Sequence, residues 1–133
     1  MTRAASSLLF MRAVASAAAP TSHPYGGVEF RRRGETACFA KLVAIDRETV
    51  EITGMYAPTR GGGRHAMSLL CLLADLHEVT LRLVAASSVP SRMDTARVAE
   101  WYRRFGFRGD GLDMFGGVPM ERLSCALPFR LAS

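Results

Sequence analysis

The spacing of hydrophobic positions changes several times along the chain, and each change marks an expected element. Residues 1–20 carry apolar side chains at three- and four-residue steps, which predicts a first helix that Pro20 closes. Its expected apolar face is Leu8, Met11, Val14 and Ala15. The same segment contains Arg3, Arg12, several Ser and Ala and no acid, a composition also typical of a cleaved targeting peptide. We favour the helix, because so small a domain needs it for its core.

Three segments between residues 28 and 56 have the composition and alternation of strands. They are Val28–Arg32, Thr36–Ile45 and Thr49–Tyr56. Short turns separate them, Arg33-Gly34 after the first and Asp46-Arg47 after the second. Successive strands joined by short turns predict an antiparallel meander.

Helical spacing returns in the second half of the chain. A helix is expected over His65–Leu76, with its apolar face at Leu69, Leu72, Leu73 and Leu76. Val79–Ala85 alternates and predicts a strand. Asp94 or Thr95 caps another expected helix, which runs to about Phe105 and ends at Gly106. The apolar face of this helix is expected at Val98, Trp101, Tyr102 and Phe105.

The remaining segments are expected to be loops and two short strands. Thr21–Gly27, Ser87–Arg92 and Gly109–Gly117 are rich in turn residues. Phe107-Arg108 begins a short strand, and Val118–Leu127 forms a last one. This order of elements predicts a mixed α/β sandwich built on one central sheet.

Composition limits the class of protein. The chain has 133 residues, a net charge of +5, 49% hydrophobic residues and 22% charged residues, which are the values of one globular domain over residues 1–133. They exclude a disordered acidic tail, a disulfide scaffold and a large two-domain enzyme. No apolar run reaches the ~20 residues that span a bilayer. We therefore expect no membrane partner.

The cysteines are Cys38, Cys71 and Cys125, an odd number at wide spacings. No CxxC or CxxH pattern occurs, so we expect no metal site. Cys71 and Cys125 stand among apolar residues, so buried reduced thiols are expected. These thiols indicate a reducing compartment and a cytoplasmic location.

The most informative segment is Arg60-Gly61-Gly62-Gly63-Arg64, between an expected strand and an expected helix. A helix N-terminus presents free backbone N–H groups and the positive end of its dipole. Glycines let an anion approach the backbone, and the two arginines add positive charge. The segment therefore predicts a phosphate or pyrophosphate site. It lacks the Lys-Ser/Thr pair of a Walker loop and the GxGxxG spacing of dinucleotide folds.

From Val50 to Phe107 the sequence resembles the GNAT superfamily of acyl-CoA-dependent N-acyltransferases. The [Q/R]-x-x-G-x-[G/A] loop of that superfamily is matched by Arg60 and Gly63, with His65 where a small residue is expected and Ala66 directly after it. The superfamily helix ending in [L/F]-Y-x-x-x-G-F is matched by Trp101-Tyr102-Arg103-Arg104-Phe105-Gly106-Phe107, and its final M-x-R by Met120-Glu121-Arg122.

Three features depart from the superfamily pattern. Pro58 stands one residue too close to the loop, Thr95 stands where an Asn is common, and the amino-terminal third is short. These departures leave open a degenerate domain that binds partners without catalysis.

The resemblance implies an α+β fold. It has a mixed central sheet, an antiparallel N-terminal meander, two strands splayed around a cofactor cleft and helices on both faces. It implies transfer of an acetyl group from acetyl-CoA to a primary amine by direct attack. Tyr102 would be the general acid at the coenzyme A sulfur, and Glu51 the best candidate for a general base, with water or backbone as alternatives. The cofactor-binding residues implied are Met55, Tyr56, Ala57, Arg60, Gly61, Gly62, Gly63, Arg64, His65 and Ala66.

Two alternatives remain open at this stage. One is the catalytically degenerate GNAT-fold binding module. The other is a nucleic-acid-directed protein that uses Arg31-Arg32-Arg33, Arg103-Arg104 and Arg108 on phosphates, although no specific DNA-reading motif accompanies them. The acceptor is unidentified, and the chain is expected as a monomer or homodimer. Met and Phe near 114–120 suggest a dimer that pairs its last strands.

Overall fold

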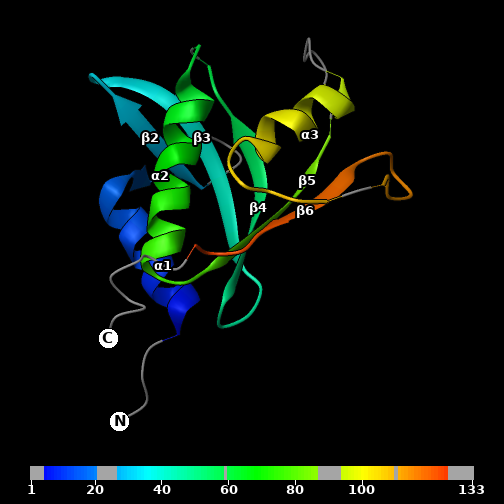
Figure 1. The fold of residues 1–133 in the computed structure, drawn as a ribbon. Coiled ribbons are helices and arrows are strands. Elements are labelled where there is room, and N and C mark those ends of the chain that lie inside the picture. Colours follow the sequence, from blue (N-terminus) through cyan, green and yellow to red (C-terminus); the bar gives the residue numbers. More distant parts are fainter. Residues whose placement is uncertain (1–4, 21–26, 59, 87–93, 110, 126–133) are drawn as a thin grey trace.

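The computed structural model describes residues 5–20, 27–58, 60–86, 94–109 and 111–125. Within these described ranges, six strands form one sheet in the order β1-β2-β3-β4-β5-β6, and three helices accompany it (Figure 1). The elements are α1 (Ser6–Ala17), β1 (Ala19–Pro20), β2 (Val28–Arg32), β3 (Glu35–Ala44), β4 (Thr49–Tyr56), α2 (Gly62–Leu76), β5 (Thr80–Ala85), α3 (Thr95–Arg103) and β6 (Val118–Arg122). The loop expected at Ser87–Arg92, most of the one at Thr21–Gly27 and the end of the last expected strand lie outside the described residues.

The expected meander is confirmed. β2, β3 and β4 pair antiparallel in succession, and the first turn places Arg33 and Gly34 at φ 55° and 80°. Positive φ at both central residues gives a turn whose twist matches that of the flanking strands. β4 then pairs parallel with β5, and β5 antiparallel with β6. The sheet is therefore mixed.

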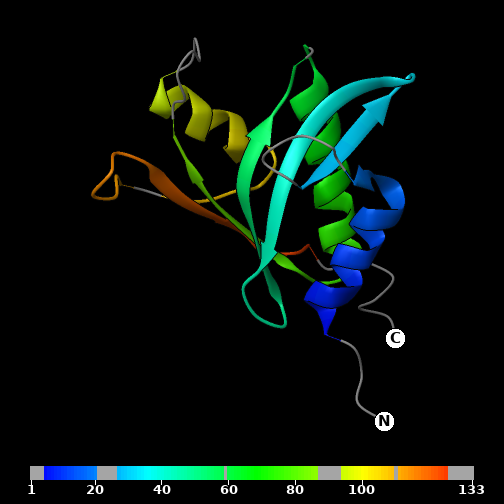
Figure 2. The ribbon, with the colours of Figure 1, turned by 180° about the vertical axis from the view of Figure 1, so that it is seen from behind.

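The core lies on one face of the sheet. Residues alternate between buried and exposed along β5 and β6, as expected of a sheet covered on one side. α1 contacts both α2 and β3, α2 contacts β3, and α3 contacts β5 (Figures 1 and 2). The other face exposes Lys41, Val43, Thr53, Arg82, Val84 and Glu121. The expectation of helices on both faces is therefore wrong for the described part of the chain.

A first helix forms as predicted, but it ends at Ala17 while Pro20 belongs to β1, and its buried face differs from the expected one. Ser7, Phe10 and Val14 are buried, whereas Leu8 and Ala15 are exposed and Met11 is half-buried. Phe10 fixes the orientation, because burying its large ring removes more apolar surface from water than burying Leu8.

Helix α2 differs from the prediction in two ways. It begins at Gly62 rather than His65, and its buried face is not the leucine series. The buried residues are Gly62, Ala66, Met67, Leu70, Cys71 and Ala74. Leu72 and Leu76 are exposed, and Leu69 and Leu73 are half-buried. Gly62, Ala66 and Ala74 are small and let the helix axis approach the sheet closely, and Met67 and Leu70 fill the core beside them, an arrangement that the pattern of leucines does not reveal.

Helix α3 begins at the expected cap, where the Asp94 carboxylate accepts a hydrogen bond from the Arg97 amide. The helix ends at Arg103, shortly before Gly106, the predicted terminating residue, which adopts a φ of 95°. Its four predicted apolar residues all pack against the core, half-buried. The short strand expected at Phe107-Arg108 is reduced to one bridge between Arg108 and Glu121.

Cys38 and Cys71 are buried and reduced, as expected, but Cys125 is exposed, which corrects the prediction for that residue. It follows the end of β6, where the chain leaves the core. Among the residues placed in the structure, no helix is long and apolar enough to cross a membrane.

Candidate active site

The parallel strands β4 and β5 pair over only three residues and then separate. Thr49, Val50 and Glu51 lie opposite Thr80, Leu81 and Arg82, yet β4 continues to Tyr56 and β5 to Ala85. A bulge accompanies the separation, since the register with β3 passes from Gly54 to Ile52 and leaves Thr53 unpaired. A bulge bends its strand and increases the local twist, which directs β4 away from β5. Beyond Glu51, the edge of β4 nearest β5 is therefore not hydrogen-bonded to that strand.

Helix α2 begins at the far end of the separated β4 (Figure 1). Gly61 precedes it at φ 82°, and no side chain caps the helix. The amides of Gly62, Gly63 and Arg64 form its first turn and have no partner within the helix. The His65 amide already donates to the Gly61 carbonyl, so the free donors are fewer than the sequence suggested. Three amides and the dipole make this end of the helix attractive to an anion.

Gly62 is required by the approach of β3 to this turn. A Cβ atom on Gly62 would lie 1.7 Å from the carbonyl oxygen of Ala37. Ala37 is itself the extra residue of a bulge in β3, because Phe30 pairs with Cys38 and Arg31 with Thr36. The bulge therefore occupies the space that a side chain at Gly62 would need.

Positive charge gathers at the same turn. The side chains of Arg60 and Arg64 are exposed there. A third cation comes from β2, where the Arg32 guanidinium donates to the Arg60 carbonyl oxygen at 3.4 Å. The sequence identified Arg32 only as part of the basic run Arg31-Arg32-Arg33. Alternation along a strand points Arg32 and Arg31 to opposite faces, a signal that separates it from its neighbours.

Tyr102 of α3 lies on the helix-covered side, near Trp101 of the same helix, Phe107 and Cys38. Its ring makes edge contacts with Trp101 and Phe107. Burial, followed by the nearby Cys38 thiol, raises the pKa of its hydroxyl. The phenol therefore stays protonated at neutral pH and is suited to donate a proton.

Trp101 forms the wall between α3 and the start of α2. It packs on Phe105, with ring centroids 4.9 Å apart. Its ring also lies 3.6 Å from the position that a Cβ atom would take on Gly63. Trp101 therefore packs in the core and at the same time borders the first turn of α2.

Glu51 occupies the vertex of the separating strands, since its partner Arg82 belongs to the last parallel pair. Its half-buried side chain lies on the face opposite to the buried Val50. Tyr102 contacts the covered face. The structure therefore places the two candidate catalytic groups on opposite sides of the sheet, and Glu51 stands where β4 and β5 separate.

The other predicted cofactor residues lie along β4 and α2. Met55 is half-buried, Tyr56 is exposed and stacked on Phe39, and Ala57 follows the strand. Ala66 is fully buried in the core, so its side chain faces away from solvent. No cluster of metal-ligating side chains occurs among the described residues.

This arrangement fits an extended molecule that carries amides and phosphates. The free edge of β4 offers backbone donors and acceptors in the way a neighbouring strand would use them. The start of α2, with Arg32, Arg60 and Arg64, offers an anion site at the end of that edge. The pantetheine arm and the pyrophosphate of coenzyme A have these chemical groups in this order.

Comparison with solved structures identifies the fold. The chain is similar to Ard1 from Thermoplasma volcanium, with a TM-score of 0.56 and 17% identity over 74% of this chain and 70% of that one. It is also similar to an acyl-CoA N-acyltransferase from Pseudomonas aeruginosa, with a TM-score of 0.52 and 18% identity over 73% and 67% of the two chains. No protein-family model and no curated protein matches the sequence.

The chain thus shares the fold of these two structures, which is the fold that the resemblance to the GNAT superfamily implied. The mixed sheet and the separated strands are confirmed features of this fold.

Proposed function

We propose that the protein is an N-acyltransferase that moves an acetyl group from acetyl-CoA to a primary amine. The observation that carries this proposal is the separation of β4 from β5 beside the uncapped start of α2. An edge that pairs with amides and a turn that binds phosphates together match the donor. The shared fold adds support.

The chain's own residues have separate roles in this proposal. The amides of Gly62, Gly63 and Arg64 hold the pyrophosphate, and Arg32, Arg60 and Arg64 neutralise its charge. Met55, Tyr56 and Ala57 supply backbone groups to the pantetheine arm. Acetyl-CoA supplies an activated thioester when it is bound. These contacts orient the thioester in the gap and exclude water from its reacting carbonyl.

The two proton transfers are assigned to groups on opposite faces of the gap, Tyr102 and Glu51. The amine attacks the thioester carbonyl, the new C–N bond forms, and the C–S bond breaks. Tyr102 donates its phenolic proton to the departing sulfur from the covered side. Glu51 accepts the proton that the amine loses, directly or through water, from the open side. The proton balance closes when Glu51 releases its proton to solvent and solvent reprotonates Tyr102.

Thermal melting with acetyl-CoA tests the proposal. Ligand at about 100 times its dissociation constant adds about 2.7 kcal/mol to the free energy of unfolding, which raises the melting temperature by several degrees. We expect an Arg60→Ala, Arg64→Ala double variant to lose most of this shift. The control is Arg12→Ala, Lys41→Ala, which removes the same charge from exposed positions on α1 and β3.

Transfer is then measured as release of free thiol from acetyl-CoA with a panel of amines. Release that requires an amine and is lost in Tyr102→Phe supports the enzyme. A melting shift without thiol release would favour the catalytically inactive binding module. No shift at millimolar acetyl-CoA, in either the natural chain or the control, would reject the donor.

A further inference from the structure

The loop before β6 exposes the most apolar surface of the described residues. Leu112 is 70% exposed, and Met114 and Phe115 are each 88% exposed. Single exposed apolar residues are common, but three on one loop of seven residues form a patch. The loop lies at the end of the molecule away from α1 and α2 (Figures 1 and 2).

This loop is held in one shape by its own hydrogen bonds. The Asp113 carboxylate accepts from the amides of Phe115 and Gly117, both at 2.9 Å. The Asp113 amide donates to the Gly117 carbonyl oxygen at 2.7 Å, and Gly116 turns the chain at φ 82°. The exposed side chains are therefore presented by an ordered turn. Such preorganisation lowers the entropy lost when a surface binds a partner.

The neighbouring strand edge is closed to pairing with another chain. Glu121 exchanges both backbone hydrogen bonds with Arg108, and Pro119 has no N–H to donate. The Gly117 amide and carbonyl are used by Asp113. Gly109 lies so close to the Pro119 carbonyl oxygen that a Cβ atom there would be 2.0 Å away. A dimer that pairs last strands, suggested by the sequence, is therefore blocked, and association here has to use side chains.

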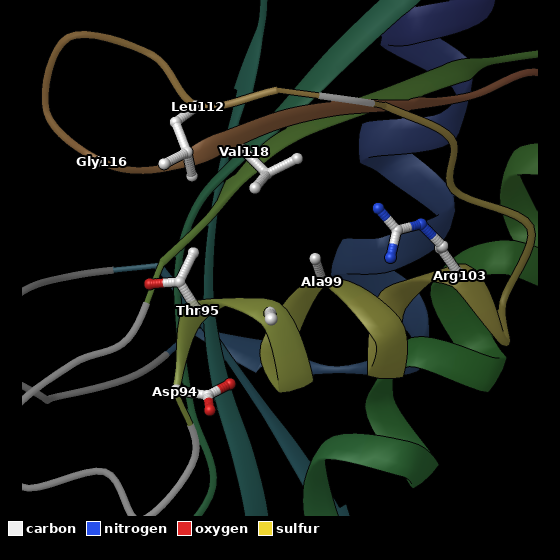
Figure 3. A pocket seen from close by; sticks show the side chains of 8 residues that line it. Asp94, Thr95, Ala99, Arg103, Leu112, Gly116 and Val118 are labelled. Carbon is white, nitrogen blue, oxygen red and sulfur yellow. The ribbon is translucent and has the colours of Figure 1, made fainter.

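A pocket of about 550 Å³ opens beside the loop, between α3 and β6 (Figure 3). Ala96 and Ala99 of α3 form one wall, and Leu112, Gly116 and Val118 form the other. Asp94, Thr95 and Arg103 complete its lining. Arg103 already donates to the Gly109 carbonyl oxygen and to Glu100. Its charge is therefore balanced, and a guanidinium plane beside the pocket suits an aromatic ring.

We propose that two copies of this chain associate by reciprocal insertion, in which Phe115 of each copy enters the pocket of the other. The inserted residue and one wall of the pocket belong to the same loop, so a two-fold axis near Gly116 satisfies both contacts at once. Leu112, Met114 and Phe115 of two copies, with the walls they cover, bury on the order of 1,200 Å², the lower limit of a specific interface. The dimer is therefore a weak one.

Sedimentation velocity between 5 and 500 µM tests the association. The natural chain is expected to pass from monomer to dimer over this range. Phe115→Ser removes the inserted side chain from an exposed turn, and Ala96→Glu places a charge in the pocket. Both weaken the dimer at least tenfold. Ala96→Glu keeps the fold, because an acid in the first turn of α3 is favourable. Leu72→Ser, at an exposed apolar position on α2, is the control and leaves the dimer unchanged.

Mixing the two variants distinguishes reciprocal insertion from any other dimer. Neither variant forms a contact with itself, but the mixture retains one, from Phe115 of Ala96→Glu to the intact pocket of Phe115→Ser. We expect more dimer in the mixture than in either variant alone. A monomeric natural chain at 500 µM overturns the proposal and leaves the pocket to a small ligand or another protein. A dimer that both variants preserve, or a mixture without dimer, also overturns it.

Discussion

Neighbouring glycines at the start of α2 serve different purposes. Gly62 lies against the Ala37 carbonyl oxygen, so its missing side chain lets the helix dock on β3. Gly63 has only ordinary contacts around its Cβ position, the nearest being Trp101 at 3.6 Å. Both provide amides to the proposed phosphate site, but only the first is demanded by packing.

Gly62→Ala is therefore expected to destabilise the protein by about 2 kcal/mol or more, because β3 or α2 has to shift. Gly63→Ala is the matched control. It adds the same methyl group one residue later, where alanine suits a helix better than glycine, and leaves stability unchanged or slightly higher. Urea denaturation of the two variants measures the difference. Equal free energies of unfolding would contradict the packing role of Gly62.

Tyr102 illustrates how burial prepares a proton donor. Its pKa is raised, so Tyr102→Phe removes a proton that is present throughout the neutral range. We expect kcat for acetyl transfer to fall about 10²-fold, with acetyl-CoA affinity and melting temperature nearly unchanged. Ser68→Ala also removes one hydroxyl group, from an exposed position on α2, and should keep full activity. An equal loss in both variants, or none in Tyr102→Phe, would remove the acid role from Tyr102.

At the scale of elements, one ion pair connects strand β6 with helix α2 and with the turn after α3. Arg122 of β6 donates to both carboxylate oxygens of Asp75 on α2, at 2.9 and 3.0 Å. The same guanidinium donates to the Phe105 carbonyl oxygen in the turn after α3. Asp75 also accepts from the Cys125 amide. Arg122 is almost fully buried, so the loss of its partner would leave a charge without compensation.

Asp75→Asn is expected to cost about 2–4 kcal/mol of unfolding free energy. The matched control is Glu100→Gln, which breaks an exposed pair with Arg103 and costs less than about 0.5 kcal/mol. Burial opposes ionisation of Asp75, but the bonds from Arg122 and Cys125 lower its pKa overall. Its stabilisation is therefore present above pH 4 and lost as the pH falls below the ordinary value of 3.8. In urea titrations, the difference in unfolding free energy between the natural chain and Asp75→Asn should be smaller at pH 3 than at pH 6. An equal difference at both pH values would contradict this role.

Elements were predictable where local pattern and tertiary environment agree. The bounds of β2 and β4 match the sequence prediction, because short turns and alternation specify a meander by local rules. Helix α2 is apolar on several sides, so the spacing of Leu69, Leu72, Leu73 and Leu76 competed with that of the buried residues. Close approach to the sheet selected the side that carries Gly62, Ala66 and Ala74, and spacing alone does not distinguish that side from the leucine side.

The candidate site was only partly predictable for a similar reason. The glycine-rich turn and Tyr102 are contiguous motifs, so the sequence reveals them directly. Arg32 reaches Arg60 across 28 residues of chain, and the bulges at Ala37 and Thr53 appear only in the register of paired strands. Contacts between distant segments depend on how the sheet assembles, which residue spacing does not encode.

The whole molecule combines one covered face with one open face. The core, Tyr102 and the start of α2 lie with the helices, whereas Glu51 lies on the other side of the separated strands. In the proposed enzyme, the acyl donor and the amine acceptor therefore meet in the gap between β4 and β5, which is open to both faces of the sheet, rather than in a pocket on one face. The pocket beside β6 is separate from this gap, so the proposed dimer leaves the gap accessible.

The covered face also determines how the whole protein responds to alkali. Burial raises the pKa of the Cys38 and Cys71 thiols from 9.0 to about 11, and burial likewise raises that of Tyr102. Below pH 9 both folded and unfolded chains keep these protons. Between about pH 9 and 11 the unfolded chain releases them first, so the free energy of unfolding falls as the pH rises.

Melting temperatures at half-unit steps from pH 7 to 11 should therefore be flat to about pH 9 and then decline. Cys38→Ala lowers the melting temperature at neutral pH by opening a small cavity, yet it reduces the further decline because one buried thiol no longer titrates. Cys125→Ser, at an exposed position, is the control and should decline like the natural chain. If Cys38→Ala declines as steeply as the natural chain, the buried thiol at Cys38 does not limit alkaline stability, and other groups on the covered face carry it.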